Sequence, residues 1–306
     1  MRPASALARI AALGVAAGLV LAAPGQPVQM PEAETPPPAV MPEEIPPTLL
    51  RAASTGQPVA DPYPSLADLS GVLSRPAMVP GEIYRNPAVG RNEVVVPDVS
   101  RTAVLIGDSQ SVPLDSWPRR ALSALGYNVH FCGYGGTGYT AANGKVGNYI
   151  DALERGDWLL PVGTPGLVVV EGGGNDAARG ASDALITANA NRLLNALKAR
   201  YPTTRIVMVG TLARGAGNGG GRRSEVDSLL AGIAAKQRIT FISAGDWLTR
   251  YNLAQHLADS VHMDGEGRTA LSAVLERRFR ESGVPNAAPK PAAAPEPEAP
   301  AGSKKG

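Results

Sequence analysis

This sequence has very little cysteine and no marked excess of charge of either sign. The 306 residues include one cysteine, Cys132, so no intrachain disulfide can form. The fold must therefore be held by a hydrophobic core, which a chain of this length can build. Lysine and arginine number 29 against 27 aspartate and glutamate residues, and no basic block stands out. This balance argues against nucleic acid as a partner.

Long apolar runs are lacking too, apart from one near the amino terminus. Residues 10–23 are apolar and follow Arg2 and Arg9. The run is shorter than the about 20 residues of a membrane-spanning helix, and its basic start is typical of a secretory signal peptide. We expect residues 1–25 to be a signal peptide or, alternatively, an uncleaved amino-terminal anchor. The protein is then secreted or associated with the cell envelope.

Both ends of the chain differ in composition from its middle. Residues 26–60 and 285–306 are rich in proline, the second segment also in alanine. Both have too little apolar content to offset the entropy of ordering the chain, so we expect a disordered linker and a disordered tail. Residues 61–98 are intermediate in composition, and we expect an extended arm there. The remaining residues, 99–284, form the predicted folded domain.

Five short apolar runs alternate with helical patterns in this domain. They are AVLI, VHFC, LVVV, IVMV and ITFI, at residues 103–106, 129–132, 167–170, 206–209 and 239–242. Such runs are typical of strands buried on both faces of a parallel sheet. Between them, apolar residues such as Ile186, Ala190, Leu193 and Leu197 share one helical face. We predict an α/β fold, a three-layer α/β/α sandwich with a mostly parallel five-stranded sheet.

Residues with catalytic chemistry follow the predicted strands, at the edge where such sheets bind ligands. Ser109 follows the first strand, and Asp259 precedes His262 by three residues after the last strand. An aspartate at this spacing can accept the imidazole Nδ1 proton and leave Nε2 free to act as a base. The three residues are therefore candidates for a relay of serine, histidine and aspartate.

The turn around His262 also leaves a metal interpretation open. His256, Asp259, His262 and Asp264 form a loose cluster of metal-ligating residue types. Metal ligands usually have a more regular spacing and a further ligand elsewhere. We therefore favour the relay and expect neither a metal nor another cofactor.

The segment GYGGTG at residues 133–138 has the G-x-G-x-x-G pattern of a dinucleotide-binding turn. Such a turn leads directly into a helix, whereas Asn143 and Gly144 interrupt any helix start here. The glycines fit better as a loop whose main-chain N–H groups stabilise an oxyanion. We expect the donors to be the N–H groups of Ser109 and Gly136 and the side-chain amide of Asn175.

Four separate segments resemble the sequence blocks of the SGNH hydrolases, the GDSL-type lipases and esterases. They are GDSQ (107–110), GYGGTGY (133–139), GGND (173–176) and DSVH (259–262). Gln110 stands where the family name has leucine. The second block lacks its usual asparagine, so Gly135 or Gly138 could replace Gly136. The resemblance spans about residues 102–275 and implies a flavodoxin-like fold.

The resemblance implies a serine esterase. Ser109 is then the nucleophile, His262 the base and Asp259 its partner. Ser109, Gly136 and Asn175 hold the oxyanion. We expect the substrate to be a small-molecule or glycan ester, with a short acyl group on a carbohydrate or glycolipid. An O-acyltransferase with the same acyl-enzyme and an inactive cell-envelope binding domain are the alternatives.

A glycine-rich loop, ARGAGNGGGRR at residues 213–223, follows the fourth predicted strand at the same edge of the sheet. Its Arg214, Arg222 and Arg223 are candidates to bind a carboxylate or phosphate on the substrate. Solvated arginines on a mobile surface loop are the alternative. Trp117, shortly after Ser109, is a candidate for the edge of the acyl pocket, with plain core packing as the alternative.

Overall fold

The computed structural model describes residues 78–290 and contains the predicted parallel sheet. Its five strands lie in the order β4-β3-β5-β6-β7, and all neighbours are parallel. Their bounds are β3 Thr102–Gly107, β4 Asn128–Gly133, β5 Leu167–Glu171, β6 Ile206–Val209 and β7 Thr240–Ile242. Each of the five apolar runs seen in the sequence forms one of these strands, so the strand prediction is confirmed.

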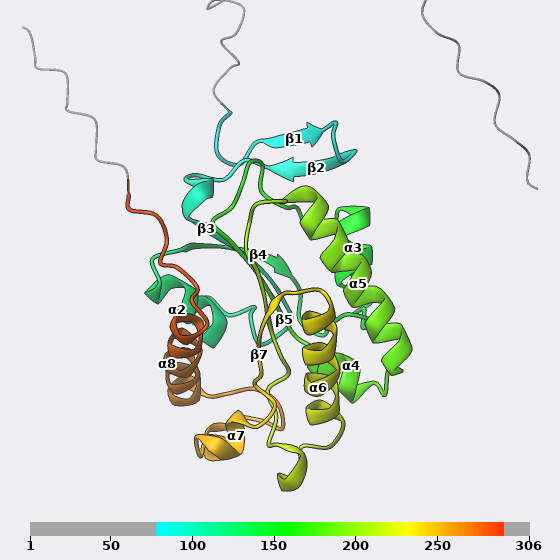
Figure 1. The fold of residues 1–306 in the computed structure, drawn as a ribbon, viewed down its shortest axis with the longest axis vertical. Coiled ribbons are helices and arrows are strands. Elements are labelled where there is room, and N and C mark those ends of the chain that lie inside the picture. Colours follow the sequence, from blue (N-terminus) through cyan, green and yellow to red (C-terminus); the bar gives the residue numbers. More distant parts are fainter. Residues whose placement is uncertain (1–77, 291–306) are drawn as a thin grey trace, which may run out of the picture. The chain divides into compact units, whose positions relative to one another are not determined.

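Helices cover both faces of the sheet, as Figure 1 shows. One face carries α2 (Trp117–Ala124) and α8 (Gly265–Glu281), which pack against each other. The other face carries α3 (Tyr149–Arg155), α5 (Asp183–Arg200) and α6 (Gly221–Lys236). Two short helices, α4 (Gly174–Ala178) and α7 (Trp247–Arg250), follow β5 and β7. The predicted three-layer α/β/α fold is therefore confirmed.

Two apolar cores lie on the two sides of the sheet, because successive side chains of a strand point to opposite faces. Val104 and Ile106 of β3 belong to the core under α3, α5 and α6. Ala103 and Leu105 belong to the core under α2 and α8. All four side chains are fully buried. Burial on both faces explains why the strands appear in the sequence as unbroken apolar runs.

A β-hairpin precedes the sheet, where the sequence suggested an extended arm. Its strands β1 (Ile83–Asn86) and β2 (Arg91–Val94) are antiparallel. Glu93 of β2 is buried and accepts hydrogen bonds from Arg200 at the end of α5. Val94 N donates to Leu160 O, just ahead of β5, so the hairpin lies at the amino edge of the sheet. Figure 1 shows it at the opposite end of the domain from α7.

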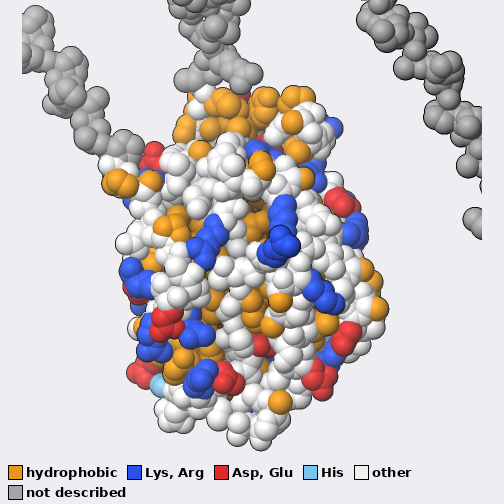
Figure 2. All heavy atoms as spheres, in the orientation of Figure 1, with side chains coloured by type: hydrophobic (Ala, Val, Ile, Leu, Met, Phe, Trp, Pro, Cys, Tyr) orange, Lys and Arg blue, Asp and Glu red, His pale blue; other side chains and the backbone are white. Residues whose placement is uncertain are grey.

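The hairpin end of the domain also exposes apolar side chains. Met78, Val79, Ile83 and Tyr84 are between 36% and 63% exposed. Figure 2 shows hydrophobic atoms gathered over this end.

The carboxyl boundary of the domain lies beyond the predicted residue 284. Tyr127 Oη donates to Pro285 O at 3.1 Å, and Ala287 N donates to Leu125 O at 2.9 Å. Residues 285–287 therefore pack on the domain instead of starting a free tail. The predicted signal peptide, the linker and most of the tail lie outside the described residues. Between residues 78 and 290, no helix combines the length and apolar character of a membrane span.

Candidate active site

The polar segments picked out in the sequence meet at the carboxyl edge of the sheet. Gly107 at the end of β3 pairs in register with Gly133 at the end of β4. On the other side of β3, Ile106 pairs with Val170 of β5, so Glu171 ends at the same edge. Asp108 and Ser109 leave β3 there. Parallel register thus brings residues from distant parts of the chain to one place.

Ser109, His262 and Asp259 form a continuous chain of hydrogen bonds. The distance from Ser109 Oγ to His262 Nε2 is 2.8 Å, and the distance from His262 Nδ1 to Asp259 Oδ2 is also 2.8 Å. Ser109 and His262 are separated by 153 residues in the sequence. The structure therefore brings together the three residues that the sequence suggested, in the predicted order of contact.

The turn from Asp259 to His262 orients the Asp259 carboxylate toward His262 and favours its ionised form. Asp259 Oδ1 accepts the main-chain N–H groups of Val261 and His262, each at 2.7 Å. Hydrogen bonds from the His262 main chain and side chain lower the pKa of Asp259 to about 2. Asp259 is consequently ionised at neutral pH, and its Oδ2 can accept the Nδ1 proton of His262.

His256 lies outside this chain of contacts. Its Nδ1 is 3.5 Å from Asp264 Oδ2 and 3.7 Å from Glu266 Oε2. Asp264 also accepts the N–H of Gly267 at 2.7 Å and so caps α8. The four residues of the metal interpretation thus separate into two pairs. Among residues 78–290, no three His, Cys, Asp or Glu side chains are placed to hold a metal ion together.

Gln110 connects the nucleophile segment to the histidine turn, a role that sequence reasoning missed. Its Nε2 donates to Val261 O at 2.9 Å, and its Oε1 accepts from Trp117 Nε1 at 3.2 Å. A leucine, the residue of the family name, could make neither bond. The polar residue at this position was the only signal in the sequence.

Trp117 is a core residue and does not edge an acyl pocket, which corrects the functional prediction. Its side chain is fully buried. The ring packs edge-on against Trp247, with centroids 6.0 Å apart. An aromatic pair of this geometry stabilises the core. The contribution of Trp117 to the site is indirect, through its hydrogen bond to Gln110.

The glycine segment after β4 lies beside Ser109 and continues as a loop until α3 begins. A Cβ atom placed on Gly135 would lie 3.7 Å from Ser109 Cβ, whereas one on Gly136 would lie 3.6 Å from Asn143 Cβ. The N–H of Gly138 already donates to Ala141 O. The N–H groups of Ser109, Gly135 and Gly136 have no acceptor among the described residues. Gly135 is therefore the glycine in contact with the nucleophile, and the role of Gly136 stays a prediction.

Asp176 fixes the far end of this loop. Its Oδ1 accepts the N–H and the hydroxyl of Thr140, both at 2.6 Å, and its Oδ2 accepts Tyr139 N at 3.0 Å. Asn189 of α5 donates to Tyr139 O at 2.9 Å. The block GGND thus supplies an anchor for the block GYGGTGY, which a motif comparison alone does not show.

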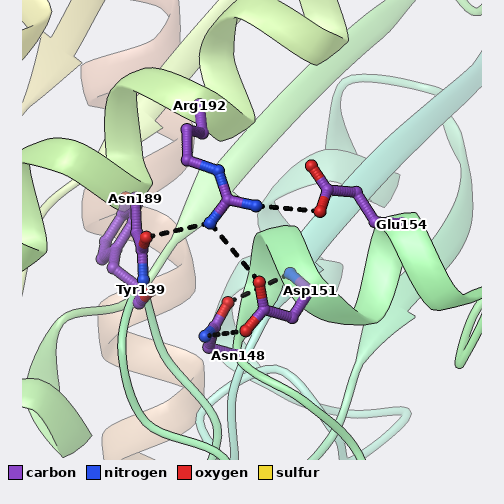
Figure 3. A network of polar contacts seen from close by, with 6 residues as sticks. All are labelled: Tyr139, Asn148, Asp151, Glu154, Asn189 and Arg192. Carbon is purple, nitrogen blue, oxygen red and sulfur yellow. Dashed lines mark hydrogen bonds and ion pairs between the residues drawn. The ribbon is translucent and has the colours of Figure 1, made fainter.

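Figure 3 shows the polar contacts that connect Tyr139 of this loop to the helices behind it. Arg192 of α5 contacts the side-chain oxygen of Asn189 at 3.3 Å and pairs with Glu154 of α3 at 2.8 Å. Asp151 of α3, 3.5 Å from Arg192, accepts a hydrogen bond from Asn148. The loop therefore rests on two helices that are joined to each other by polar contacts.

Asn175 lines the cavity beside Ser109, and its amide group is engaged within the protein. Nδ2 donates to Thr137 O at 2.9 Å and to Asp108 Oδ2 at 3.1 Å. Asp108 Oδ1 in turn accepts the N–H of Gln110 at 2.9 Å. Asp108 therefore orients Asn175 toward the nucleophile segment. The oxyanion role of Asn175 remains a prediction.

Two buried carboxyl groups lie behind the nucleophile. Burial raises the pKa of Asp108 to about 6. Burial, with the neighbouring Asp108 as a second cause, raises the pKa of Glu171 well above its usual range. Ser111 Oγ donates to Glu171 Oε2 at 2.8 Å. Sequence reasoning gave Glu171 no role, although an acid directly after four apolar strand residues was a visible signal.

Ser109 stands between two hollows of different character. One is an open groove of about 530 Å³ that also contacts His262 and Gly135. Its other lining residues are Val112, Pro113, Phe131, Gly133 and Tyr134. The second is a polar cavity of about 10 Å³ whose lining includes Gln110, Asn175 and Arg223. Ser109 therefore borders an open, mostly apolar space on one side and a polar space with room for about one water-sized group on the other.

The three arginines of the glycine-rich loop are not equivalent. Arg222 is held on the surface by Asp183, by Glu225 and by the carbonyl of Ala181, so the prediction that it binds substrate is corrected. Arg223 lines the cavity beside Ser109. Arg214 is exposed and lines a neighbouring cavity together with Arg223.

Comparison with known proteins places this chain in a family. The model of the GDSL-like lipase/acylhydrolase family matches residues 100–270, and the chain belongs to that family. The recognised resemblance to the SGNH hydrolases is thereby confirmed, and the protein is an ester hydrolase of this class. No curated protein matches the sequence.

Solved structures with a similar fold include two family two carbohydrate esterases. An active-site mutant from Clostridium thermocellum has 14% sequence identity and a TM-score of 0.48, over 63% of this chain and 67% of that one. The enzyme from Cellvibrio japonicus has 17% identity and a TM-score of 0.47, over 63% and 64%. A lipolytic protein of the G-D-S-L family from Veillonella parvula has 17% identity and a TM-score of 0.44, over 58% and 98%. This chain thus spans about two thirds of the length of the two carbohydrate esterases.

Proposed function

We propose that this protein is an exported serine esterase that removes a short acyl group from a carbohydrate or glycolipid. One observation carries the assignment of the catalytic residues. The hydrogen-bond chain from Ser109 Oγ through His262 to Asp259, with both distances at 2.8 Å, has the geometry of an activated nucleophile.

The first half of the proposed reaction forms an acyl-enzyme. His262 Nε2 takes the proton of Ser109 Oγ as that oxygen attacks the ester carbonyl carbon. The ionised Asp259 stabilises the imidazolium through its contact with Nδ1. His262 then protonates the leaving alcohol as the carbon–oxygen bond breaks. A water molecule, deprotonated by the same imidazole, hydrolyses the acyl-enzyme and restores Ser109.

The negative charge on the carbonyl oxygen needs hydrogen-bond donors close to Ser109. The N–H groups of Ser109 and Gly135 are proposed to supply two, with Gly136 next to them. Asn175 supplies a further donor when its amide exchanges Thr137 O or Asp108 for the oxyanion. Catalytic hydrogen bonds often form fully only in the substrate complex, so this exchange belongs to the bound state.

The lining of the groove beside His262 supports a role in binding the acyl group. This groove is open, and its walls are mostly apolar. In the polar cavity, the amide of Gln110 is bonded to Val261 and Trp117, and the hydroxyl of Thr211 donates to Gly172 O. The guanidinium of Arg223 is therefore the main group that this cavity offers to acceptors on a substrate. The proposal that the protein is exported depends on residues 1–25 alone. Measuring the mass of the mature protein tests it, because the mass shows whether these residues have been removed.

A labelling experiment combined with an ester series tests the proposal. A fluorophosphonate probe should label the wild-type protein and leave Ser109→Ala unlabelled, because the probe reacts with an activated serine. In a series of p-nitrophenyl esters from acetate to palmitate, kcat/KM should be highest for the shortest acyl groups. Acetate release from an acetylated oligosaccharide checks the carbohydrate part. Equal labelling of both proteins, or a preference for palmitate, would contradict the proposal.

A further inference from the structure

Resting on the proposed function, we infer that Arg223 forms an anion subsite beside Ser109, so that the preferred substrate carries a carboxylate or a phosphate. The guanidinium lines the cavity shared with Ser109 and Asn175. It also lines a second, neighbouring cavity of about 190 Å³. One charged group therefore borders both the cavity that contains Ser109 and the cavity next to it.

The neighbouring Arg222, on the same helix, differs from Arg223 in its ion pairs. Arg222 pairs with Asp183 and Glu225, and 30% of its side chain is exposed. Arg223 has no ion pair within the described part of the chain. Its one hydrogen bond there runs from Nη1 to Leu212 O at 3.3 Å. Two consecutive arginines thus differ in that, within the described residues, only the second has no ion pair.

The fold makes room for Arg223 at this place. A Cβ atom on Gly174 would lie 2.9 Å from Arg223 Nη1, closer than side-chain carbons approach. Gly174 directly precedes Asn175, the predicted oxyanion donor. A glycine in the third block therefore allows the guanidinium to lie against the main chain of the site. This approach places a positive charge next to Asn175, the residue proposed to donate to the oxyanion.

The acidic groups near Arg223 form no ion pair with it. Asp108 and Glu171 line the cavity that Arg223 shares with Ser109, and a pKa of about 6 leaves Asp108 mostly ionised at neutral pH. Among residues 78–290, no acidic residue lines the second cavity. An anion therefore meets the charge of Arg223 most favourably from the second cavity.

The second cavity has the remaining features of an anion site. Arg214 lines it together with Arg223, and Ser260 adds a hydroxyl group. Gly219 and Gly220 contribute main chain without side chains. The planar guanidinium binds carboxylate and phosphate oxygens through two parallel hydrogen bonds. Both groups share this chemistry, so the structure defines the subsite as one for anionic oxygens.

Pairs of esters that differ in charge test the subsite, because they show how strongly the enzyme prefers an anionic substrate over a neutral one. On the alcohol side we compare methyl 4-acetoxybenzoate with 4-acetoxybenzoate and 4-acetoxyphenyl phosphate. On the acyl side we compare 4-nitrophenyl valerate with mono-4-nitrophenyl glutarate. In Arg223→Gln the ratio of kcat/KM for an anionic ester to that for its neutral partner should fall about tenfold or more on one side, the effect of losing a charge-assisted hydrogen bond. Comparing kcat/KM for 4-acetoxybenzoate and 4-acetoxyphenyl phosphate shows which anion is preferred.

Two further variants give the controls. Arg223→Lys keeps the charge and should retain part of the ratio, while losing the paired hydrogen bonds of the guanidinium. Arg222→Gln removes a neighbouring charge of the same sign and should leave the ratio unchanged. An unchanged ratio in Arg223→Gln, or an equal fall in Arg222→Gln, overturns the subsite. Ester cleavage that depends on Ser109 in the same assays shows that the proposed function stands even then.

A binding measurement tests the subsite without catalysis. Inorganic phosphate should raise the Tm of the wild-type protein and of Ser109→Ala relative to chloride at equal ionic strength, because a ligand that binds only the folded state stabilises it. Arg223→Gln should lose this increase, and Arg222→Gln should keep it. The absence of any phosphate-specific increase, together with an unchanged ester ratio, contradicts the inference. Loss of all ester cleavage with a retained phosphate effect would overturn the proposed function alone.

Discussion

Buried carboxyl groups lie at both edges of the sheet, and they differ in whether an arginine pairs with them. At the amino edge, Glu93 is 1% exposed and accepts hydrogen bonds from two nitrogens of Arg200. At the carboxyl edge, Asp108 and Glu171 are as deeply buried, but no arginine or lysine among residues 78–290 forms an ion pair with either. One edge holds a compensated charge and the other holds groups whose pKa is raised by burial.

This difference separates stability from chemistry within one sheet. A paired carboxylate ties β2 to α5 and closes the amino end of the domain. Unpaired carboxyl groups at the other end hold Ser111 and Asn175 by hydrogen bonds and leave Arg223 free of a partner. Perturbed pKa values of this kind cluster at functional sites. Substitutions at the carboxyl edge should therefore affect rate most, and substitutions at the amino edge should affect stability most.

The largest effect is expected for His262→Ala at the carboxyl edge. Without the imidazole, nothing accepts the proton of Ser109, and turnover should fall by about 10⁶-fold, the scale for losing one member of a catalytic triad. The Tm should change little, because the side chain is 44% exposed. Steady-state kinetics on a p-nitrophenyl ester, with thermal unfolding in parallel, measures both.

His256→Ala is the matched control for that variant. His256 lies in the same part of the chain and contacts Asp264 and Glu266, away from Ser109. It should keep nearly full turnover. If both histidine variants lose activity to the same extent, the hydrogen-bond chain to Ser109 is not what the reaction depends on.

A smaller loss of rate is expected for Asn175→Ala. Removal of one oxyanion donor lowers turnover by about 10²–10³-fold when the donor acts in the transition state. The loss should appear in kcat, with KM little changed. A raised KM with an unchanged kcat would instead identify Asn175 as a residue that binds the ground state of the substrate.

At the amino edge, Glu93→Ala should act on stability alone. Removing one partner of a buried ion pair leaves Arg200 without its carboxylate and costs about 3–5 kcal/mol of unfolding free energy. Turnover per folded molecule should be unchanged, since the hairpin and the active site lie at opposite ends of the strands. Urea denaturation and active-site titration measure the two quantities. A fall in kcat as large as that of Asn175→Ala would show that the two edges are coupled.

The sequence allowed the sheet, its order of elements and the chain of Ser109, His262 and Asp259 to be predicted. Strands buried on both faces leave unbroken apolar runs, and an aspartate three residues before a histidine is a local pattern. Each of these features leaves a recognisable pattern in a short stretch of the sequence. Strand ends in a parallel sheet then meet at one edge by geometry alone.

Contacts between distant segments that leave no pattern in the local sequence could not be predicted. The pairing of Glu93 with Arg200 spans 107 residues, and nothing local distinguishes Glu93 from an exposed glutamate. Arg222 and Arg223 are adjacent and identical in type, so the sequence does not distinguish them. In the structure, Arg222 pairs with Asp183 and Arg223 lines the cavity. Trp117 resembled a pocket residue by its position after Ser109, and its packing against Trp247 decided otherwise.

The smallest expected effect is a dependence of stability on pH that comes from Glu171. Burial raises the pKa of this carboxyl group, so the folded protein keeps a proton that the unfolded chain releases near the ordinary pKa of 4.5. Above that pH the folded state binds more protons than the unfolded state, and the free energy of unfolding decreases as pH rises toward the pKa of the folded state. Asp259 has the opposite sign. Its pKa is lowered to about 2, so its contribution is present above its ordinary pKa of 3.8 and is lost as pH falls through 2.

The two contributions therefore act in different pH ranges, and Glu171→Gln isolates the first. The glutamine keeps an acceptor for Ser111 Oγ and removes the titrating group. From pH 4.5 upward, the stability of the variant relative to the wild-type protein should increase, because only the wild-type protein must either retain a proton or bury a charge. Urea denaturation of both proteins between pH 4.5 and 8 measures the difference. A difference that stays constant across this range would show that Glu171 is as well compensated as Glu93, and the contrast between the two edges of the sheet would then be lost.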